Sequence, residues 1–228
     1  MATLKWLGHA CVEVNIAGKR IIIDPFVSDN PSSSVKLDEL LKQEPDVIAV
    51  THDHYDHMGD APAILKSTSK TKLFAAFDLS NYIITQAGVN EDRVIAGNVG
   101  GYVNYEGVKL ALTKAVHTSE HSDPTGVIVS GEGITLYHAG DTGLFSDMEL
   151  IGKVFSPDYV MVPIGGTYTM DVDQAVMAVE MLKPRRAAIP IHYNTWPPIS
   201  ANPDEFVNKV KTKGYKAIIL KPGETIPL

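Results

Sequence analysis

The sequence contains a single cysteine, Cys11, among its 228 residues, so an intramolecular disulfide is excluded. Its neighbours Ala10 and Val12 are apolar, which favours a buried structural thiol over a reactive one. No apolar run approaches the roughly 20 residues of a membrane span, and the first residues lack the pattern of a signal peptide. We therefore expect a cytoplasmic protein without a membrane partner.

Positive charge is also scarce, because 20 Lys and Arg residues face 27 Asp and Glu residues, for a formal net charge of -7. A surface that follows a nucleic-acid backbone needs an excess of positive charge, so nucleic acid is not an expected partner. Low-complexity segments are absent, and no linker-like stretch divides the chain. We expect one globular domain spanning residues 1–228.

Strand and helix patterns alternate along the chain. The alternating Val12, Val14 and Ile16, between apolar runs at 4–7 and 21–23, predict an opening β-meander. Further strands are predicted at 47–50, 72–76, 127–129, 134–137, 159–162, 187–191 and 217–220. Helical spacing of apolar residues appears at 37–41, 61–66, 79–86, 172–182 and 206–213. Two packed sheets with helices outside would bury these apolar runs, so the fold class is α/β (α+β) in four αββα layers.

The densest cluster of polar residues directly follows the predicted strand at 47–50. It holds five potential metal ligands within six positions: His52, Asp53, His54, Asp56 and His57. Two residues apart on extended backbone, His52 and His54 point the same way and suit one ion. Asp56 and His57 follow a turn and face a second position, whereas Asp53 is left to support the loop. Zinc, iron and manganese all accept imidazole nitrogen and carboxylate oxygen.

Three further ligand candidates, His117, Asp141 and His192, stand at the ends of other predicted strands. Functional residues of α/β sheets gather at the carboxyl ends of strands, so these loops are expected to converge on one edge. His121 is the alternative to His117, which we favour because it follows its strand directly.

The order of these motifs resembles the metallo-β-lactamase superfamily over essentially the whole chain. The stretch from His52 to His57 matches its HxHxDH signature, and His117, Gly140-Asp141-Thr142 and His192 match its later motifs in their usual order. Within it, Trp6-Leu7-Gly8-His9, Asp24-Pro25 and Ile191-His192-Tyr193 resemble the subgroup of ascorbate-6-phosphate lactonase-like proteins and uncharacterised metal-dependent hydrolases. The resemblance implies the four-layer αββα sandwich of that superfamily.

The resemblance also implies a site for two divalent metal ions, which the sequence does not restrict among Zn, Mn, Fe and Ni. His52, His54 and His117 would bind the first ion, Asp56, His57 and His192 the second, and Asp141 both. A metal-bridging hydroxide would attack the substrate beside Asp56, the expected catalytic residue, since a metal lowers the pKa of bound water from about 15.7 towards about 7. No cysteine is available as a ligand, which argues against antibiotic hydrolysis.

Four other residues are candidates for supporting the ligands or contacting substrate: His9, Asp24, His121 and His138. Metal-bound histidines usually donate their second N–H to a carboxylate, carbonyl or water, a role that suits Asp24. His9 and His138 either border the site or are satisfied core histidines. Tyr193 and Trp196 either line a pocket or pack in the core, and the methionines at 161, 170, 177 and 181 are read as core filling.

The expected function is hydrolysis of a small ester, lactone or phosphodiester. The expected partner is therefore a small-molecule substrate, either neutral or anionic. The alternatives are a nuclease of the same superfamily, a mononuclear-iron oxygenase acting on a thiol or persulfide, and a metal-binding module without turnover. Loops at 26–34 and 193–201 would set the substrate. A homo-oligomer stays open, because the sequence shows neither heptads nor an obvious self-pairing segment.

Overall fold

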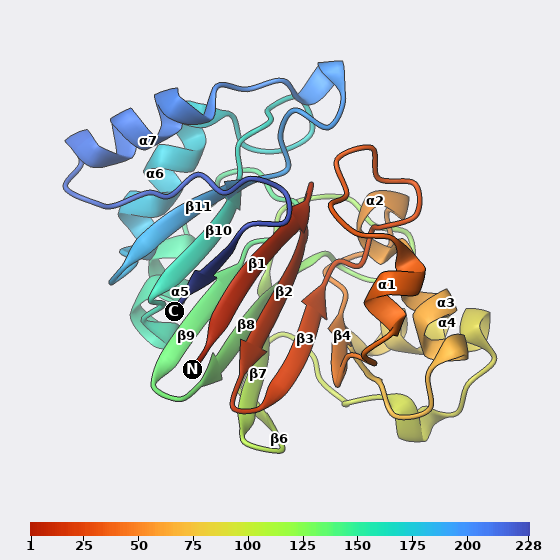
Figure 1. Cartoon of the computed structure of the whole chain (residues 1–228). Helices are drawn as coiled ribbons and strands as arrows, with labels where there is room; N and C mark the ends of the chain where they lie inside the picture. The colour runs from red at the N-terminus through yellow and green to blue at the C-terminus, as the bar shows by residue number, and fades with distance from the viewer.

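The computed structural model describes residues 1–228 and contains two six-stranded sheets packed face to face with helices outside (Figure 1). The first sheet has the order β12-β1-β2-β3-β4-β5. Its strands are β1 (Thr3–Gly8), β2 (Cys11–Ile16), β3 (Lys19–Ile23), β4 (Val47–Ala49), β5 (Lys72–Phe74) and β12 (Thr225–Pro227). β1, β2 and β3 form the predicted antiparallel meander, and β4 and β5 continue parallel to β3.

The second sheet has the order β11-β10-β9-β8-β7-β6. Its strands are β6 (Val103–Tyr105), β7 (Val108–Lys114), β8 (Thr125–Gly131), β9 (Ile134–His138), β10 (Tyr159–Pro163) and β11 (Ala187–Ile191). β6 to β9 are antiparallel, whereas β9, β10 and β11 are parallel. The parallel strands are buried along their whole length, as expected for strands covered on both faces.

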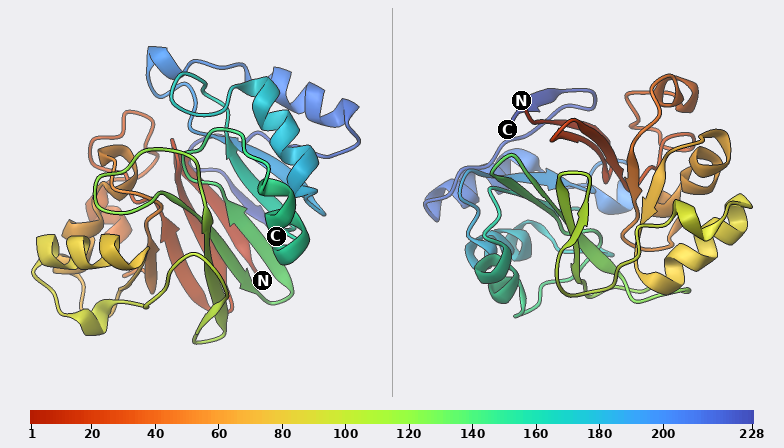
Figure 2. Two further views of the ribbon diagram at one scale, coloured as in Figure 1. Left: turned by 180° about the vertical axis from the view of Figure 1, so that it is seen from behind. Right: turned by 90° about the horizontal axis from the view of Figure 1, so that it is seen from below.

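Helices cover the outer faces of both sheets (Figure 2). On the side of the first sheet lie α1 (Leu37–Leu41), α2 (Tyr55–Met58), α3 (Ala61–Ser67) and α4 (Phe77–Ala87), and on the side of the second lie α5 (Met148–Phe155), α6 (Val172–Leu182) and α7 (Pro203–Thr212). The short 3-10 turns Glu91–Arg93 and Pro197–Ile199 complete the helical elements. The predicted αββα sandwich is confirmed. None of these helices combines the length and apolar character that a membrane crossing requires.

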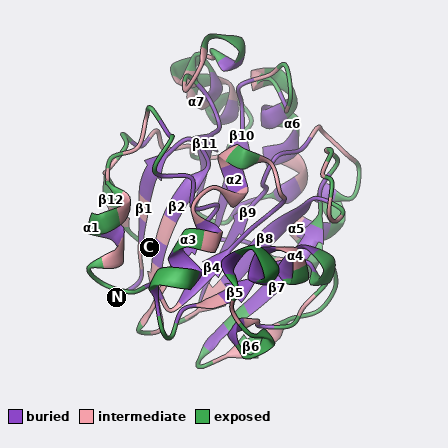
Figure 3. Ribbon diagram, turned by 90° about the vertical axis from the view of Figure 1, so that its right-hand side faces the viewer, coloured by how far each residue is buried: buried purple, intermediate pink, exposed green.

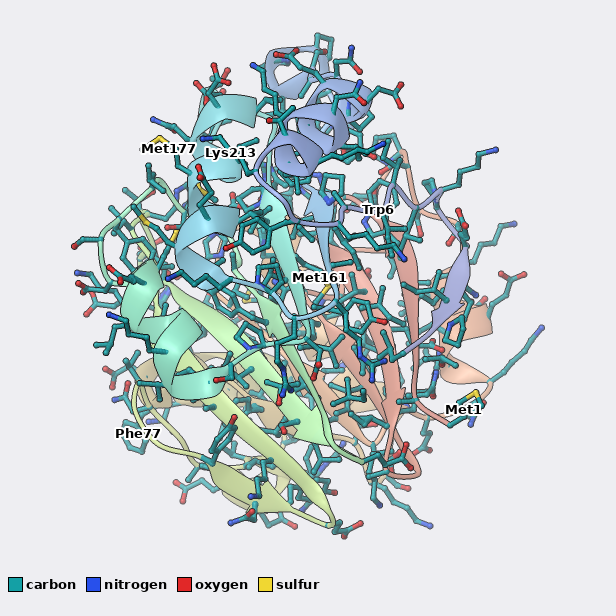
Figure 4. All side chains as sticks on the ribbon, turned by 90° about the vertical axis from the view of Figure 1, so that its left-hand side faces the viewer. Met1, Trp6, Phe77, Met161, Met177 and Lys213 are labelled. Carbon is teal, nitrogen blue, oxygen red and sulfur yellow. The ribbon has the colours of Figure 1, made fainter.

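One continuous core of 62 buried residues fills the space between and around the sheets (Figure 3). Met161 on β10 is fully buried in it, whereas Met177 on α6 is 48% exposed (Figure 4). The expectation that Met177 fills the core was therefore wrong. The buried residues of α6 are Ala175, Val176, Ala178, Val179 and Leu182, and the helical period turns Met177 to the opposite side.

The prediction of a last strand at 217–220 was also wrong. This segment makes only one isolated bridge, between Ala217 and Ala188 of β11, and then leaves the second sheet. The chain crosses to the first sheet, where Gly223 N–H donates to the Trp6 carbonyl and β12 pairs with β1. The C-terminal segment thus connects the outer strands of both sheets. Helices α2 and α5 were not predicted.

Candidate metal centre

The predicted ligands lie on loops at one common edge of the two sheets. His9 follows β1, Asp24 follows β3, and the stretch from His52 to His57 follows β4. In the second sheet, the loops after β7, β9 and β11 carry His117, Asp141 and His192. β7, β9 and β11 run in the same direction, because β8 is antiparallel to both β7 and β9, and β9, β10 and β11 are parallel. The topology therefore brings residues far apart in sequence to one place.

The first group of ligand atoms comes from His52, His54 and His117. Nε2 of His52 lies 3.0 Å from Nδ1 of His54, and Nε2 of His117 lies 3.3 Å from the same atom. Two ligand atoms about 2.0–2.1 Å from a tetrahedral zinc ion would be about 3.3 Å apart. The spacing of these three nitrogens therefore matches one metal ion.

The second group consists of Asp56, His57 and His192, joined by His9. Oδ2 of Asp56 lies 3.7 Å from Nε2 of His192 and 3.1 Å from Nε2 of His9. One ligand atom from each of the four residues lies within 4.8 Å of the others. A carboxylate and at least two imidazoles are thus available to a second ion.

Asp141 lies between the two groups. Its Oδ1 is 3.2 Å from Nε2 of His57, and its Oδ2 is 3.1 Å from Nε2 of His192. The same Oδ2 is 3.6 Å from Nε2 of His117, in the first group. A single carboxylate therefore faces ligands of both groups.

The hydrogen bonding of these atoms fits residues that bind a cation. Nε2 of His57, Oδ1 of Asp141 and both ring nitrogens of His192 are buried without a hydrogen-bond partner. Nε2 of His57 and Oδ1 of Asp141 are 3.2 Å apart but do not form a hydrogen bond. A buried polar group without a partner costs about 1–3 kcal/mol, and three of these atoms, Nε2 of His57, Nε2 of His192 and Oδ1 of Asp141, lie beside the carboxylate of Asp141 or belong to it. Imidazole and carboxylate donors directed at one space fit a divalent metal.

The charges in the site are strongly coupled. Burial disfavours the imidazolium of His57, but Asp141 and Asp24 outweigh it and hold the pKa of His57 well above its usual value. Burial also disfavours the imidazolium of His192, but the charge of Asp141 outweighs it and raises the pKa of His192 to about 9. Burial and the charge of His57 lower the pKa of His52 to about 3. Without a metal, positive charge on His57 and His192 balances the carboxylates; a bound cation would take over that role.

One carboxylate orients a histidine of each group. Nδ1–H of His57 donates to Oδ2 of Asp24 at 2.7 Å, which leaves Nε2 for a metal. Thr51 donates its backbone N–H and its hydroxyl to Asp24, each at 2.8 Å. The hydroxyl oxygen of Thr51 in turn lies 3.0 Å from Nδ1 of His52 and accepts its proton. Asp24 thus sets the tautomer of His57 directly and that of His52 through Thr51. No role was predicted for Thr51 from the sequence.

His9 and His138 differ in their hydrogen-bond partners. His9 is buried between Oγ1 of Thr195, 2.8 Å from its Nδ1, and Asp56. Burial lowers the pKa of His9 to about 4, so the neutral ring accepts from Thr195 and donates to Asp56. His138 donates from Nε2 to the carbonyl of Ala10 at 2.8 Å and accepts the Gly140 N–H at Nδ1. His138 is a satisfied core histidine that fixes the loop before Asp141.

His121 points away from the ligand groups. Its Nδ1 is 2.6 Å from Oδ2 of Asp53, and Asp53 also accepts the backbone N–H groups of Glu120 and His121. The structure therefore places His117, and not His121, beside His54. Asp53 joins the His-rich loop to the loop at 117–121.

Strained backbone is concentrated at the site. His9, Asp24 and His192 have φ values of +57°, +49° and +54°, in the left-handed region that side chains rarely adopt. Such residues persist only where the surroundings impose them. At His192 the neighbouring loop supplies this constraint. The backbone of Gly165 packs so closely that a Cβ on it would lie 2.4 Å from the His192 carbonyl oxygen. Only glycine allows the loop after β10 to approach the loop of His192 this closely.

A cavity of about 480 Å³ opens over the ligands. Besides His54, Asp56, His117, Asp141 and His192, it is lined by Tyr55, Thr118, Tyr168, Trp196, Pro198 and Ile199. No lysine or arginine lines it. Trp196 thus forms part of the wall, whereas Tyr193 is buried in a stack with Trp6 at a ring distance of 5.6 Å.

Comparison with known proteins places the chain in a family. The family model of the beta-lactamase superfamily domain matches residues 3–192. UPF0173 metal-dependent hydrolases of Sulfurisphaera tokodaii and Metallosphaera sedula are 59% and 61% identical over 228 residues, covering 100% of each chain. Among solved structures, Igni18, a metallo hydrolase from Ignicoccus hospitalis, is 40% identical with a TM-score of 0.90, covering 99% of this chain and 97% of that one. The chain therefore belongs to the metallo-β-lactamase superfamily and, within it, to the subgroup of metal-dependent hydrolases that its motifs predicted.

Proposed function

We propose that the protein is a dinuclear metal-dependent hydrolase that cleaves a small carbonyl ester or lactone. The observation that carries this proposal is the position of Asp141, whose two oxygens face both groups of ligand atoms. A carboxylate shared in this way suits two ions held side by side. The names of the relatives as metal-dependent hydrolases support the same reaction class.

Each ion would be bound by three side chains of its own and by a fourth that both ions share. His52, His54 and His117 would hold the first ion, Asp56, His57 and His192 the second, and Asp141 both. Two divalent ions among Zn, Mn, Fe and Ni would supply a water activated to hydroxide near neutral pH and a positive charge to polarise the scissile carbonyl. Asp24 and Thr51 hold His57 and His52 in the tautomers that this requires.

Asp56 is the residue we assign to catalysis as well as to metal binding. Burial favours its neutral acid, but the neighbouring His192 and His9 hold the pKa of Asp56 far below its usual value. It is therefore ionised and serves as a ligand or hydrogen-bond acceptor rather than as an acid. Its short distances to His9 and His192 involve Oδ2, which leaves Oδ1 to accept a hydrogen bond from the attacking water and orient it.

The cavity wall favours an uncharged substrate over a phosphodiester. Its size, about 480 Å³, falls in the range of about 300–1,000 Å³ typical of small-molecule sites. Tyr55, Tyr168, Trp196 and Ile199 provide apolar surface, and no lysine or arginine is present to bind a phosphate. Beyond the metal ions, nothing in this wall would select for an anion.

The same features weigh against two of the alternatives. A nuclease would need lysine or arginine side chains to follow a phosphate backbone, and the cavity has neither in a chain of net charge -7. A mononuclear iron oxygenase would use only one group of ligands, whereas here Asp56, His57 and His192 gather in a second group around the shared Asp141.

The experiment measures metal content and turnover together. Protein purified without chelators and loaded in turn with Zn, Mn, Fe and Ni is expected to bind up to two ions per chain and to hydrolyse phenyl acetate or γ-butyrolactone. His52→Ala and Asp141→Ala should lose metal and activity, whereas Asp147→Ala, an exposed aspartate on the surface, serves as the control. If both site variants keep metal and turnover, the assignment fails. Turnover of bis(4-nitrophenyl) phosphate without ester hydrolysis would instead change the substrate class.

A further inference from the structure

A second cavity, of about 530 Å³, adjoins the cavity over the metal ligands. The two share His54, Tyr55 and Thr118 as lining residues. A molecule whose scissile group reaches the metal ligands can therefore extend past Tyr55 into the second cavity. That side of the site contains none of the seven proposed ligands except His54.

His121 is held rigidly at this second cavity. Its Nδ1 lies 2.6 Å from Oδ2 of Asp53, and its backbone N–H donates to the same oxygen at 2.7 Å. Its ring stacks on the ring of Tyr82, with the centroids 3.5 Å apart and an angle of 14° between the planes. The side chain is still 32% exposed. An imidazole with its orientation set and one nitrogen left over is well prepared to bind a ligand.

The hydrogen bonds define which nitrogen carries the proton. Asp53 also accepts from the Ser119 hydroxyl at 2.6 Å and from the Glu120 N–H at 3.0 Å. Since the carboxylate can only accept, the proton of a neutral His121 lies on Nδ1, and Nε2 is an acceptor. This arrangement repeats the relation of His57 to Asp24, but His121 lines the second cavity and not the cavity over the metal ligands.

The remainder of the cavity also favours a hydrogen-bond donor as ligand. Glu120 and Asp53 are its acidic lining residues, and no lysine or arginine lines it. Tyr55 and Tyr82 add aromatic side chains to the lining. A group that donates hydrogen bonds, such as an alcohol, matches these acceptors, whereas an anion would be repelled by Glu120.

We propose that His121 is a substrate-specificity residue whose Nε2 accepts a hydrogen bond from a hydroxyl group on the part of the substrate remote from the scissile bond. The substrate class is thus an ester or lactone that carries a free hydroxyl. This proposal rests on the proposed function for the reaction, but the binding of a hydroxylated group stands on the second cavity alone.

The kinetic test compares glyceryl monobutyrate with propyl butyrate, which differ by two hydroxyl groups, on the metal-loaded enzyme. His121→Asn keeps an N–H donor for Asp53 but removes Nε2. We expect it to lower kcat/KM for glyceryl monobutyrate by about 5- to 10-fold, the loss typical of one hydrogen bond, and to leave propyl butyrate within about twofold. Asn81→Ala, an exposed change on α4 beside Tyr82, should alter neither. An equal fall on both esters, or no fall on glyceryl monobutyrate, overturns the proposal.

A binding test separates this proposal from the proposed reaction. In zinc-loaded protein labelled with ¹⁵N-histidine, the Nε2 resonance of His121 should show the unprotonated ring nitrogen and should shift on titration with glycerol. Both results support the proposal even if wild-type enzyme hydrolyses neither ester, in which case the proposed reaction alone fails. A proton on Nε2, or no shift at the highest glycerol concentration, overturns it.

Discussion

Nδ1 of His57 lies 2.7 Å from Oδ2 of Asp24, and neither side chain has any exposed surface. The pair links a carboxylate after β3 to a histidine on α2. Because Asp24 is buried and also accepts two hydrogen bonds from Thr51, its position is determined before any metal binds. The ligand nitrogen of His57 is therefore oriented by the protein itself.

We predict that Asp24→Asn weakens metal binding by about 10- to 100-fold, the usual effect of removing a partner of a ligand histidine. The amide cannot accept from Thr51 and His57 as the carboxylate does. Zinc affinity measured by competition with a chromophoric chelator checks this prediction. Asp29→Asn, an exposed change in the loop after β3, is the matched control. Equal affinity in Asp24→Asn and wild type would show that the orientation of His57 does not matter.

Metal removal should destabilise the fold. Three buried candidate ligand atoms, Nε2 of His57, Nε2 of His192 and Oδ1 of Asp141, lack hydrogen-bond partners. An ion that binds only the folded state stabilises it by about 4 kcal/mol at a free concentration one thousand times its Kd. For a chain of this length we expect Tm to rise by about 8–16 °C per ion on zinc addition. Differential scanning calorimetry with and without zinc measures the shift. Asp141→Ala should abolish most of it, and an unchanged shift in that variant would contradict a shared ligand.

Cys11 should be inert in the folded protein. Burial, reinforced by the negative charge of Asp24, raises the pKa of the Cys11 thiol well above its usual value. Because a raised pKa keeps the thiol protonated, very little thiolate is present at about pH 8, where an exposed cysteine reacts readily. Mass spectrometry should find no iodoacetamide adduct on native protein and one adduct in guanidinium chloride. Rapid labelling of the native protein would disprove the burial of Cys11.

Gly165→Ala tests the close approach of two loops. The new Cβ would lie 2.4 Å from the carbonyl oxygen of His192, so one loop must move. We expect a loss of stability of about 1–3 kcal/mol from this overlap and weaker metal binding through displacement of His192. Urea unfolding and zinc titration measure the two effects. Gly101→Ala is the control, because a Cβ there meets nothing within 4 Å; equal behaviour of the two variants would refute the overlap.

Much of the fold could be predicted because strands leave a local signal. The run Ile21–Ile23, the alternation of Val12, Val14 and Ile16, and the buried stretch at 159–162 each reveal a strand through its burial pattern. The segment at 217–220 shares this signal and is not a strand, since its partner Ala188 offers one bridge before the chain turns to β1. Pairing depends on distant residues that a local pattern does not contain. The one-turn helix α2 is too short to show a period.

The types of candidate metal ligand, their order and their places at strand ends could be read from the residues between His52 and His192, because each depends on residue type and local pattern. Which nitrogen of each ring is free depends on contacts that form only in the folded chain. The tautomers of His52 and His57 depend on Asp24 and Thr51, and the separate course of His121 depends on Asp53 and Tyr82. The reason is physical: a residue type states what a side chain can donate or accept, and only its neighbours in space decide which of these bonds it makes.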